Sequence, residues 1–273
     1  MSGVGAERFP VLEIRPWVKI CGVTRPQDAA LAVELGATLV GVNFWPRSKR
    51  RVEPARAREI VAAVSGRAPV VGVFVDEAPG RIEELLASVG FDLVQLHGDE
   101  PDDVVARFGP RALRALRAQP GRASAARKRP MKKGGSGGGG GEGGAEADIA
   151  SAPDPGAAES GCFSLQQHAF PAVSGLDGCF ALLLDGPAGE RYGGTGRAWG
   201  WELARPAVVS ARVPALIAGG IRPETAAEAL ALSGATGVDL ASGVEASPGV
   251  KDPEKMKGLM ESIRTVRERR TRG

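Results

Sequence analysis

Short apolar runs alternate along this chain with longer segments in which apolar and polar residues recur at helical spacing. The runs are rich in valine, leucine and isoleucine, which is typical of parallel strands covered on both faces. Strands are expected at residues 17–21, 39–44, 70–75, 92–97, 112–116, 180–185, 214–218 and 237–241. Helices are expected at residues 25–35, 54–64, 79–89, 101–108, 163–170, part of 199–210, 223–232 and 252–267.

The pattern therefore predicts eight strand-then-helix units. Alternating strands and helices imply a parallel sheet with right-handed crossovers. Eight units favour a closed (β/α)8 TIM barrel of the α/β class over an open sheet. The 273 residues form a single domain in this interpretation, because barrels of this kind contain about 250 residues.

Two stretches lie outside the repeating pattern. Residues 1–16 are expected to be a frayed N-terminal extension, and the barrel then occupies residues 17–273. Residues 120–160, after the fifth strand, have no apolar periodicity: a basic run precedes a glycine tract at Gly134–Gly144. Such a composition buries too little apolar surface to offset the entropy of ordering, so a long disordered low-complexity insertion is expected there.

Composition narrows the classes of function. A formal net charge of +3 gives no support for a nucleic-acid or membrane partner, and no apolar run has the length of a membrane span. Cys21, Cys162 and Cys179 are too scattered for a disulfide framework or a zinc site. The N-terminus lacks a signal-peptide pattern, so a cytoplasmic location is expected. A monomer or homodimer is also expected.

The loops that follow the strands of such a barrel meet at one face, where ligands bind. Cys21, His97 and Asp185 stand at strand ends on that face. The loops after the seventh and eighth strands contain Gly219–Gly220 and Ser242–Gly243. Because glycine lets the backbone approach an anion closely and Ser242 adds a hydroxyl donor, these loops predict a phosphate site.

Cys21 and Asp185 are expected on opposite sides of the barrel mouth, where a thiol and a carboxyl group suit paired proton transfer. The alternatives are a small buried hydrophobe for Cys21 and a turn carboxylate or helix cap for Asp185. Thr24, with Gln27 three residues on, is predicted to cap the first helix. Lys19 shares the inward parity of Cys21 and is expected to fill the barrel with its stem.

Eight blocks carry a resemblance to a known family. They are Lys19–Thr24, Gly41–Phe44 with Ser48–Arg50, Val94–Glu100, Leu183–Asp185, Gly193–Gly196, Ala218–Glu224, Val238–Glu245 and Pro248–Asp252. Taken in this order, they resemble the signatures of the phosphoribosylanthranilate isomerases of tryptophan biosynthesis. No single block is specific, whereas the ordered set is.

The resemblance implies an Amadori rearrangement, in which N-(5-phosphoribosyl)anthranilate becomes 1-(2-carboxyphenylamino)-1-deoxyribulose 5-phosphate. It implies that Asp185 is the general acid, that Cys21 is the general base and that Arg50 pairs with the anthranilate carboxylate. The other substrate-binding residues that it implies are His97, Gly194, Gly219, Gly220, Ser242 and Gly243. Gly194 would lie in a loop that closes over this small phosphorylated substrate. No cofactor or metal is needed, because the substrate nitrogen serves as the electron sink.

The chain departs from the family at Gly200, where an acidic residue is usual before Trp201, and at Ala241, where serine is common. Two alternatives stay open: another sugar-phosphate isomerase or epimerase barrel, and a non-catalytic barrel whose insertion binds a partner. Metal-dependent epimerases need ligands that two histidines supply poorly. The isomerase of histidine biosynthesis has an aspartate in place of Cys21.

Overall fold

Eight parallel strands close into a barrel in the computed structural model, which describes residues 7–118, 170, 176, 178–186 and 199–272. The strands are β1 (Trp17–Ile20), β2 (Leu39–Asn43), β3 (Val70–Phe74), β4 (Leu93–Leu96), β5 (Ala112–Arg117), β6 (Ala181–Asp185), β7 (Ala215–Ile217) and β8 (Gly237–Leu240). Each strand pairs with the next along the chain, and β8 closes the ring by pairing with β1. The predicted TIM barrel is confirmed.

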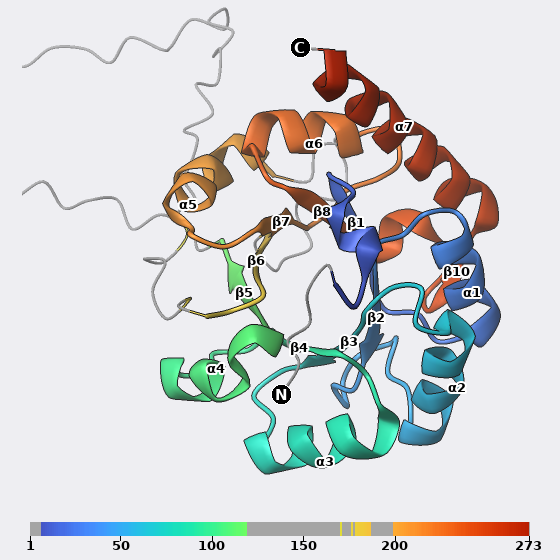
Figure 1. Cartoon of the computed structure of the whole chain (residues 1–273), viewed down its shortest axis with the longest axis vertical. Coiled ribbons are helices and arrows are strands. Elements are labelled where there is room, and N and C mark those ends of the chain that lie inside the picture. Colours follow the sequence, from blue (N-terminus) through green and yellow to red (C-terminus); the bar gives the residue numbers. More distant parts are fainter. Residues whose placement is uncertain (1–6, 119–169, 171–175, 177, 187–198, 273) are drawn as a thin grey trace, which may run out of the picture. The chain divides into compact units, whose positions relative to one another are not determined.

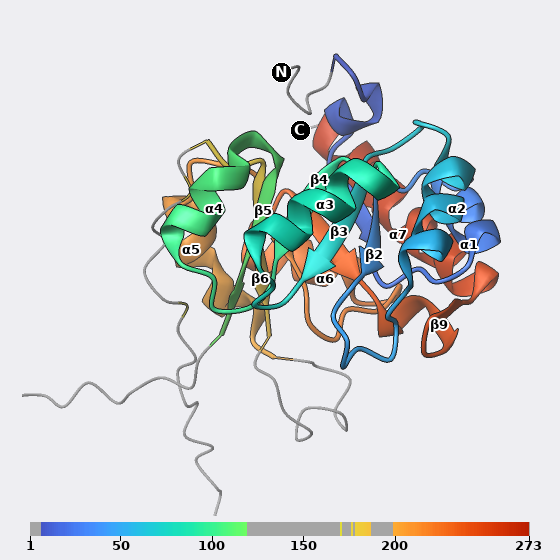
Figure 2. The same ribbon diagram turned by 90° about the horizontal axis from the view of Figure 1, so that it is seen from below.

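Helices lie outside the ring of strands (Figures 1 and 2). The α-helices are α1 (Pro26–Glu34), α2 (Pro54–Val64), α3 (Pro79–Val89), α4 (Asp102–Phe108), α5 (Arg205–Ser210), α6 (Ala226–Ser233) and α7 (Pro253–Arg272). The short 3-10 helices are η1 (Pro10–Glu13), η2 (Gly109–Arg111), η4 (Trp201–Ala204) and η5 (Ser242–Val244). None of the helices in the described part of the chain is long and apolar enough to cross a bilayer.

Proline begins four of these helices: Pro26, Pro54, Pro79 and Pro253. The proline ring fixes φ at a helical value. Because N–H groups in the first turn have no acceptor within the helix, the missing N–H of proline costs no hydrogen bond there. The sequence pattern therefore placed these starts within one residue. The predicted helix at 223–232 begins later, at Ala226, because residues 223–225 form a turn.

The predicted capping role of Thr24 is wrong. Arg25 is the residue that precedes α1, and no side chain caps the helix there. Instead, the Thr24 hydroxyl donates a hydrogen bond of 2.6 Å to the carbonyl of Gly249. The hydroxyl that local spacing predicted to cap the helix thus binds a carbonyl that is distant in sequence.

Side chains of β1 alternate between the two faces of the barrel wall. Val18 and Ile20 belong to the cluster between strands and helices, whereas Trp17 belongs to the cluster inside the barrel. Phe9 and Leu12 join the interior cluster, and the Trp17 indole donates a hydrogen bond to the Leu12 carbonyl at 2.8 Å. The described part of the predicted N-terminal extension is therefore packed against the barrel rather than frayed.

A two-stranded antiparallel hairpin, absent from the sequence prediction, follows the barrel. It consists of β9 (Glu245–Ser247) and β10 (Val250–Lys251). Several predictions lie outside the described residues: the insertion at 120–160, all of the helix at 163–170 except Phe170, and the loop with Gly194. By their contacts, the described residues of the barrel form one compact unit.

Candidate active site

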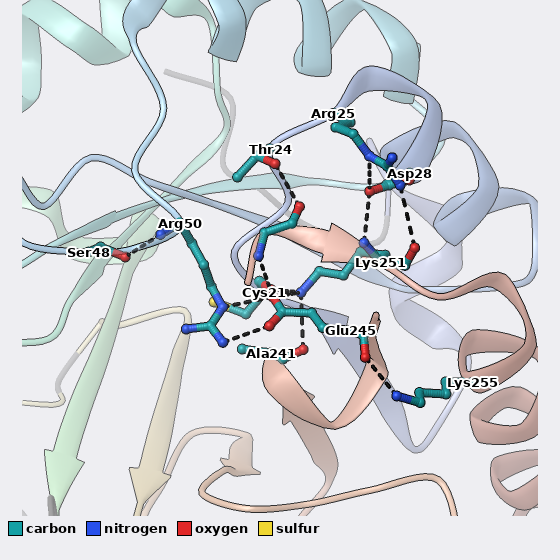
Figure 3. A network of polar contacts seen from close by, with 11 residues as sticks. Cys21, Thr24, Arg25, Asp28, Ser48, Arg50, Ala241, Glu245, Lys251 and Lys255 are labelled. Atoms are coloured by element: carbon teal, nitrogen blue, oxygen red, sulfur yellow. Dashed lines mark hydrogen bonds and ion pairs between the residues drawn. The ribbon is translucent and has the colours of Figure 1, made fainter. Parts of the chain in front are cut away.

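A cavity of about 200 Å³ opens at the carboxyl ends of the barrel strands. Its wall includes most of the predicted site residues, namely Cys21, His97, Asp185, Gly219, Gly220, Ser242 and Gly243. They lie at the end of β6 or directly after β1, β4, β7 and β8, so closure of the barrel is what gathers them. Of the other two predicted residues, Arg50 lies beside Cys21 (Figure 3), and Gly194 lies outside the described residues.

Cys21 directly follows β1 and continues its pairing with β8, because its N–H donates to the Leu240 carbonyl at 2.8 Å. The residue is buried. Burial and the negative charge of Asp239 raise the pKa of the Cys21 thiol, whereas the ammonium groups of Lys19 and Lys251 act in the opposite direction. Ionisation of the Cys21 thiol to the thiolate therefore depends on the neighbouring cations.

Lys19 and Asp239 form an ion pair inside the barrel, with 2.9 Å between Nζ and Oδ1. They are partners in the β1–β8 register, so both side chains point to the interior. Burial opposes the charge of Lys19, but Asp239 and Cys21 outweigh it and raise the lysine pKa. The sequence prediction treated Lys19 as a filler and did not include Asp239, although Asp239 lies in one of the family-like blocks.

His97 contacts the predicted general acid. Its Nε2 lies 3.2 Å from Oδ2 of Asp185, and the N–H of Gly186 donates to Oδ1 at 2.9 Å. On the other side of the ring, Gln95 Nε2 lies 2.6 Å from His97 Nδ1. With the amide as donor, the ring proton is on Nε2 and points to Asp185. Gln95, which the sequence prediction omitted, contacts the ring on the side opposite Asp185 and so helps to orient it.

Close backbone contacts explain two glycines of the predicted phosphate loops. A Cβ on Gly243 would lie 2.0 Å from the carbonyl oxygen of Ile221, which belongs to the loop after β7. Gly219 has a φ of +86°, and a Cβ there would lie 2.7 Å from the nitrogen of Gly186. Hydrogen in place of a side chain at Gly243 therefore lets the two phosphate loops approach each other, and at Gly219 it lets the loop after β7 approach the end of β6.

A network of charged groups joins the loop after β2 to the β9–β10 hairpin (Figure 3). Arg50 donates from Nε and Nη2 to the two carboxylate oxygens of Glu245, each at 2.7 Å. Lys251 Nζ lies 2.9 Å from Glu245 Oε1 and also donates to the Cys21 carbonyl at 2.6 Å. Although burial opposes its ionisation, hydrogen bonds from Arg50 and Lys251 lower the pKa of Glu245 to about 2.

The sequence prediction did not assign Glu245 or Lys251 to the site. Both residues end or fall within blocks that resemble the isomerase family, which is the signal that could have drawn attention to them. In the described part of the chain, no group of three or more His, Cys, Asp or Glu side chains is placed to hold a metal ion.

Comparison with known proteins connects this geometry to a family. The sequence model of N-(5'phosphoribosyl)anthranilate (PRA) isomerase matches residues 18–132 and 167–262. The chain belongs to the PRA isomerase family. A PRA isomerase of Syntrophus aciditrophicus is 35% identical to it over 248 residues, which cover 90% of this chain and 86% of that protein.

Solved structures of the family have the same fold. The phosphoribosyl anthranilate isomerase of Thermus thermophilus superimposes with a TM-score of 0.63 at 32% identity, covering 92% of this chain and 99% of that one. A second isomerase, in complex with reduced 1-(o-carboxyphenylamino)-1-deoxyribulose 5-phosphate, gives a TM-score of 0.62 at 27% identity, covering 91% and 98%. The two ranges matched by the PRA isomerase model contain Cys21 and Asp185, respectively.

Proposed function

We propose that this chain catalyses the Amadori rearrangement of N-(5-phosphoribosyl)anthranilate to 1-(2-carboxyphenylamino)-1-deoxyribulose 5-phosphate in tryptophan biosynthesis. The observation that carries this proposal is the presence of Cys21 and Asp185 in the wall of one cavity, together with the glycines of the loops after β7 and β8. Membership of the PRA isomerase family supports it. The neighbouring structure with the reduced product analogue shows that a relative binds this class of compound.

In the proposed mechanism, Asp185 acts as the general acid and Cys21 as the general base. Asp185 gives a proton to the ribose ring oxygen, so the ring C–O bond breaks and the substrate nitrogen forms a Schiff base. Cys21 then takes the proton from C2 of the sugar, and the electron pair moves towards the nitrogen to give an enolamine. Tautomerisation of the enolamine yields the ketone, so the reaction needs no external electron donor or acceptor.

The remaining residues bind the two charged ends of the substrate. We assign the phosphate to Gly219, Gly220, Ser242 and Gly243, whose backbone N–H groups and hydroxyl are suitable donors. We assign the anthranilate carboxylate to Arg50, because a guanidinium presents paired donors to a planar carboxylate. His97 lies between the Asp185 carboxylate and Gln95, so its contribution is to hold the general acid in place as well as to line the pocket.

Complementation tests the proposal in the cell. The gene for this chain should restore growth without tryptophan to a bacterial strain that lacks PRA isomerase. The purified protein should also consume N-(5-phosphoribosyl)anthranilate generated in the assay. A folded protein that supports neither growth nor turnover would refute the proposed function.

Other expectations from the sequence remain predictions. These are the closure of the loop with Gly194 over the substrate, a cytoplasmic location, and a monomeric or homodimeric state. Sedimentation of the purified chain would measure the last of these.

A further inference from the structure

Glu245 occupies one edge of the Arg50 guanidinium, and no residue in the described part of the chain occupies the other edge. Its two oxygens accept from Nε and Nη2, each at 2.7 Å. A guanidinium has a second pair of parallel donors, formed by Nη1 and the remaining N–H of Nη2. Among the described residues, none accepts a hydrogen bond from Nη1. Arg50 can therefore pair with a second carboxylate without releasing Glu245.

The aliphatic part of the Arg50 side chain is restricted as well as its guanidinium. A Cβ added to Gly22 would lie only 2.3 Å from Cδ of Arg50, so the arginine crosses the backbone directly after Cys21. Its side chain is one-quarter exposed, at 25%. The partly exposed side chain of Arg50 thus lies next to the proposed base.

Glu245 is itself held from several sides. Lys251 Nζ and the N–H of Gly249 both donate to Oε1, at 2.9 Å and 3.2 Å. The carboxylate side chain is only 4% exposed. Because Lys251 also binds the carbonyls of Cys21 and Ala241, at 2.6 Å and 3.1 Å, the network connects the end of β1 with the end of β8.

The charges of this network favour an incoming anion. Arg50 and Lys251 carry two positive charges, and Glu245 carries one negative charge, so these three side chains have a net charge of +1. A monocarboxylate on the open edge of Arg50 would neutralise it. The substrate of the proposed reaction has one such group on its anthranilate ring.

We propose that Glu245 is a positioning residue that fixes the plane of the Arg50 guanidinium so that its open edge receives the anthranilate carboxylate. This inference rests on the proposed function, because that function supplies the carboxylate. Holding the arginine before the substrate arrives reduces the side-chain entropy lost on binding. Glu245 therefore improves the recognition of the anthranilate end and leaves recognition of the phosphate end unchanged.

The experiment compares two ligands by isothermal titration calorimetry. Reduced 1-(o-carboxyphenylamino)-1-deoxyribulose 5-phosphate has both ends of the substrate, whereas ribulose 5-phosphate lacks the carboxyphenyl group. Glu245→Gln keeps the size of the side chain and removes its charge. It should weaken binding of the first ligand about tenfold and change binding of the second less than twofold. Steady-state assays of the same variant should show a larger rise in KM than fall in kcat.

Coupling to Arg50 is measured with a double-mutant cycle. Arg50→Met should weaken binding of the reduced product analogue more than Glu245→Gln does. The double variant should bind the analogue no more weakly than Arg50→Met alone. Glu83→Gln is the matched control, because Glu83 also forms a two-point pair with an arginine, Arg107, but on an exposed helical surface. It should bind both ligands as the unsubstituted protein does.

Three outcomes would overturn the inference. Glu245→Gln could bind the analogue as the unsubstituted protein does, it could bind both ligands more weakly to the same extent, or the effects of the Arg50 and Glu245 substitutions on analogue binding could be additive. If Glu245→Gln does not fold, Glu245→Asp provides the test. The aspartate keeps the charge that faces Lys251 but is one methylene too short to reach both cations. Glu245→Asp should therefore weaken binding of the analogue several-fold. Failure of the unsubstituted protein to bind the analogue would instead refute the proposed function.

Discussion

Lys19 and Asp239 form an ion pair of 2.9 Å inside the barrel, beside the thiol of Cys21. The two charges affect the thiol in opposite directions. The ammonium group of Lys19 favours the thiolate, and the carboxylate of Asp239 opposes it. Whether Cys21 is ionised at a given pH therefore depends on both residues of this ion pair.

The first prediction concerns the pH dependence of Cys21. Lys19→Met should raise the pKa of the thiol, because it removes a nearby positive charge, and Asp239→Asn should lower it, because it removes a nearby negative charge. The measurement is the rate of alkylation by iodoacetamide as a function of pH, in a background with Cys162→Ser and Cys179→Ala. Its midpoint should move to higher pH in the first variant and to lower pH in the second.

The acid limb of kcat/KM should move in the same two directions, because only the thiolate can take a proton. Lys19→Met also leaves a buried carboxylate unpaired, which costs on the order of 3 kcal/mol of stability. Asp239→Asn leaves the buried ammonium of Lys19 without its counter-ion at a similar cost. It keeps the size of the side chain and a hydrogen-bond acceptor for Lys19, so it is the decisive variant. An unchanged alkylation profile in Asp239→Asn would contradict the electrostatic role of the pair.

A second prediction tests the catalytic pair directly. Cys21→Ala and Asp185→Asn should each lower kcat by about a thousandfold, because each removes a proton-transfer group. Binding of the reduced product analogue should change much less. Cys179→Ala is the control: Cys179 is also buried but lies outside the cavity wall, and its loss should preserve kcat. Near-normal turnover by either catalytic variant would reject the role assigned to that residue.

A third prediction concerns the approach of the phosphate loops. Gly243→Ala places a methyl group 2.0 Å from the Ile221 carbonyl oxygen, so the loops must separate. We expect a loss of about 1–3 kcal/mol in the free energy of unfolding, together with a raised KM. The control is Gly258→Ala in α7, where the nearest atom lies 3.8 Å from the added Cβ.

Gly258→Ala should preserve activity and stabilise the protein by up to about 1 kcal/mol, because alanine favours a helix. Urea unfolding and steady-state kinetics measure both variants. Equal behaviour of the two substitutions would contradict the argument from loop contact.

A fourth prediction concerns the insertion expected at residues 120–160. The family model matches residues 18–132 and 167–262, so most of this stretch has no counterpart in the family pattern. Deleting residues 121–158 should therefore leave kcat/KM within about threefold of the full chain. A large loss of activity in a folded deletion variant would show that the insertion takes part in the reaction.

The order of strands and helices could be predicted from local pattern alone. Short apolar runs defined the strands, and prolines such as Pro54 and Pro79 marked helix starts within one residue. The prediction failed where a local signal had a distant competitor. Thr24 has the spacing of a helix cap, yet its hydroxyl binds the carbonyl of Gly249.

By itself, the sequence determined the order of strands and helices, the position of Cys21 after β1 and the glycines of the phosphate loops, because each depends on neighbours along the chain. Only the tertiary structure decided which charges meet. Lys19 and Asp239 are 220 residues apart, and Arg50 and Glu245 are 195 apart. Such pairs form only when β8 closes against β1 in one register and the β9–β10 hairpin folds beside the end of β1, and local periodicity contains no information about either event.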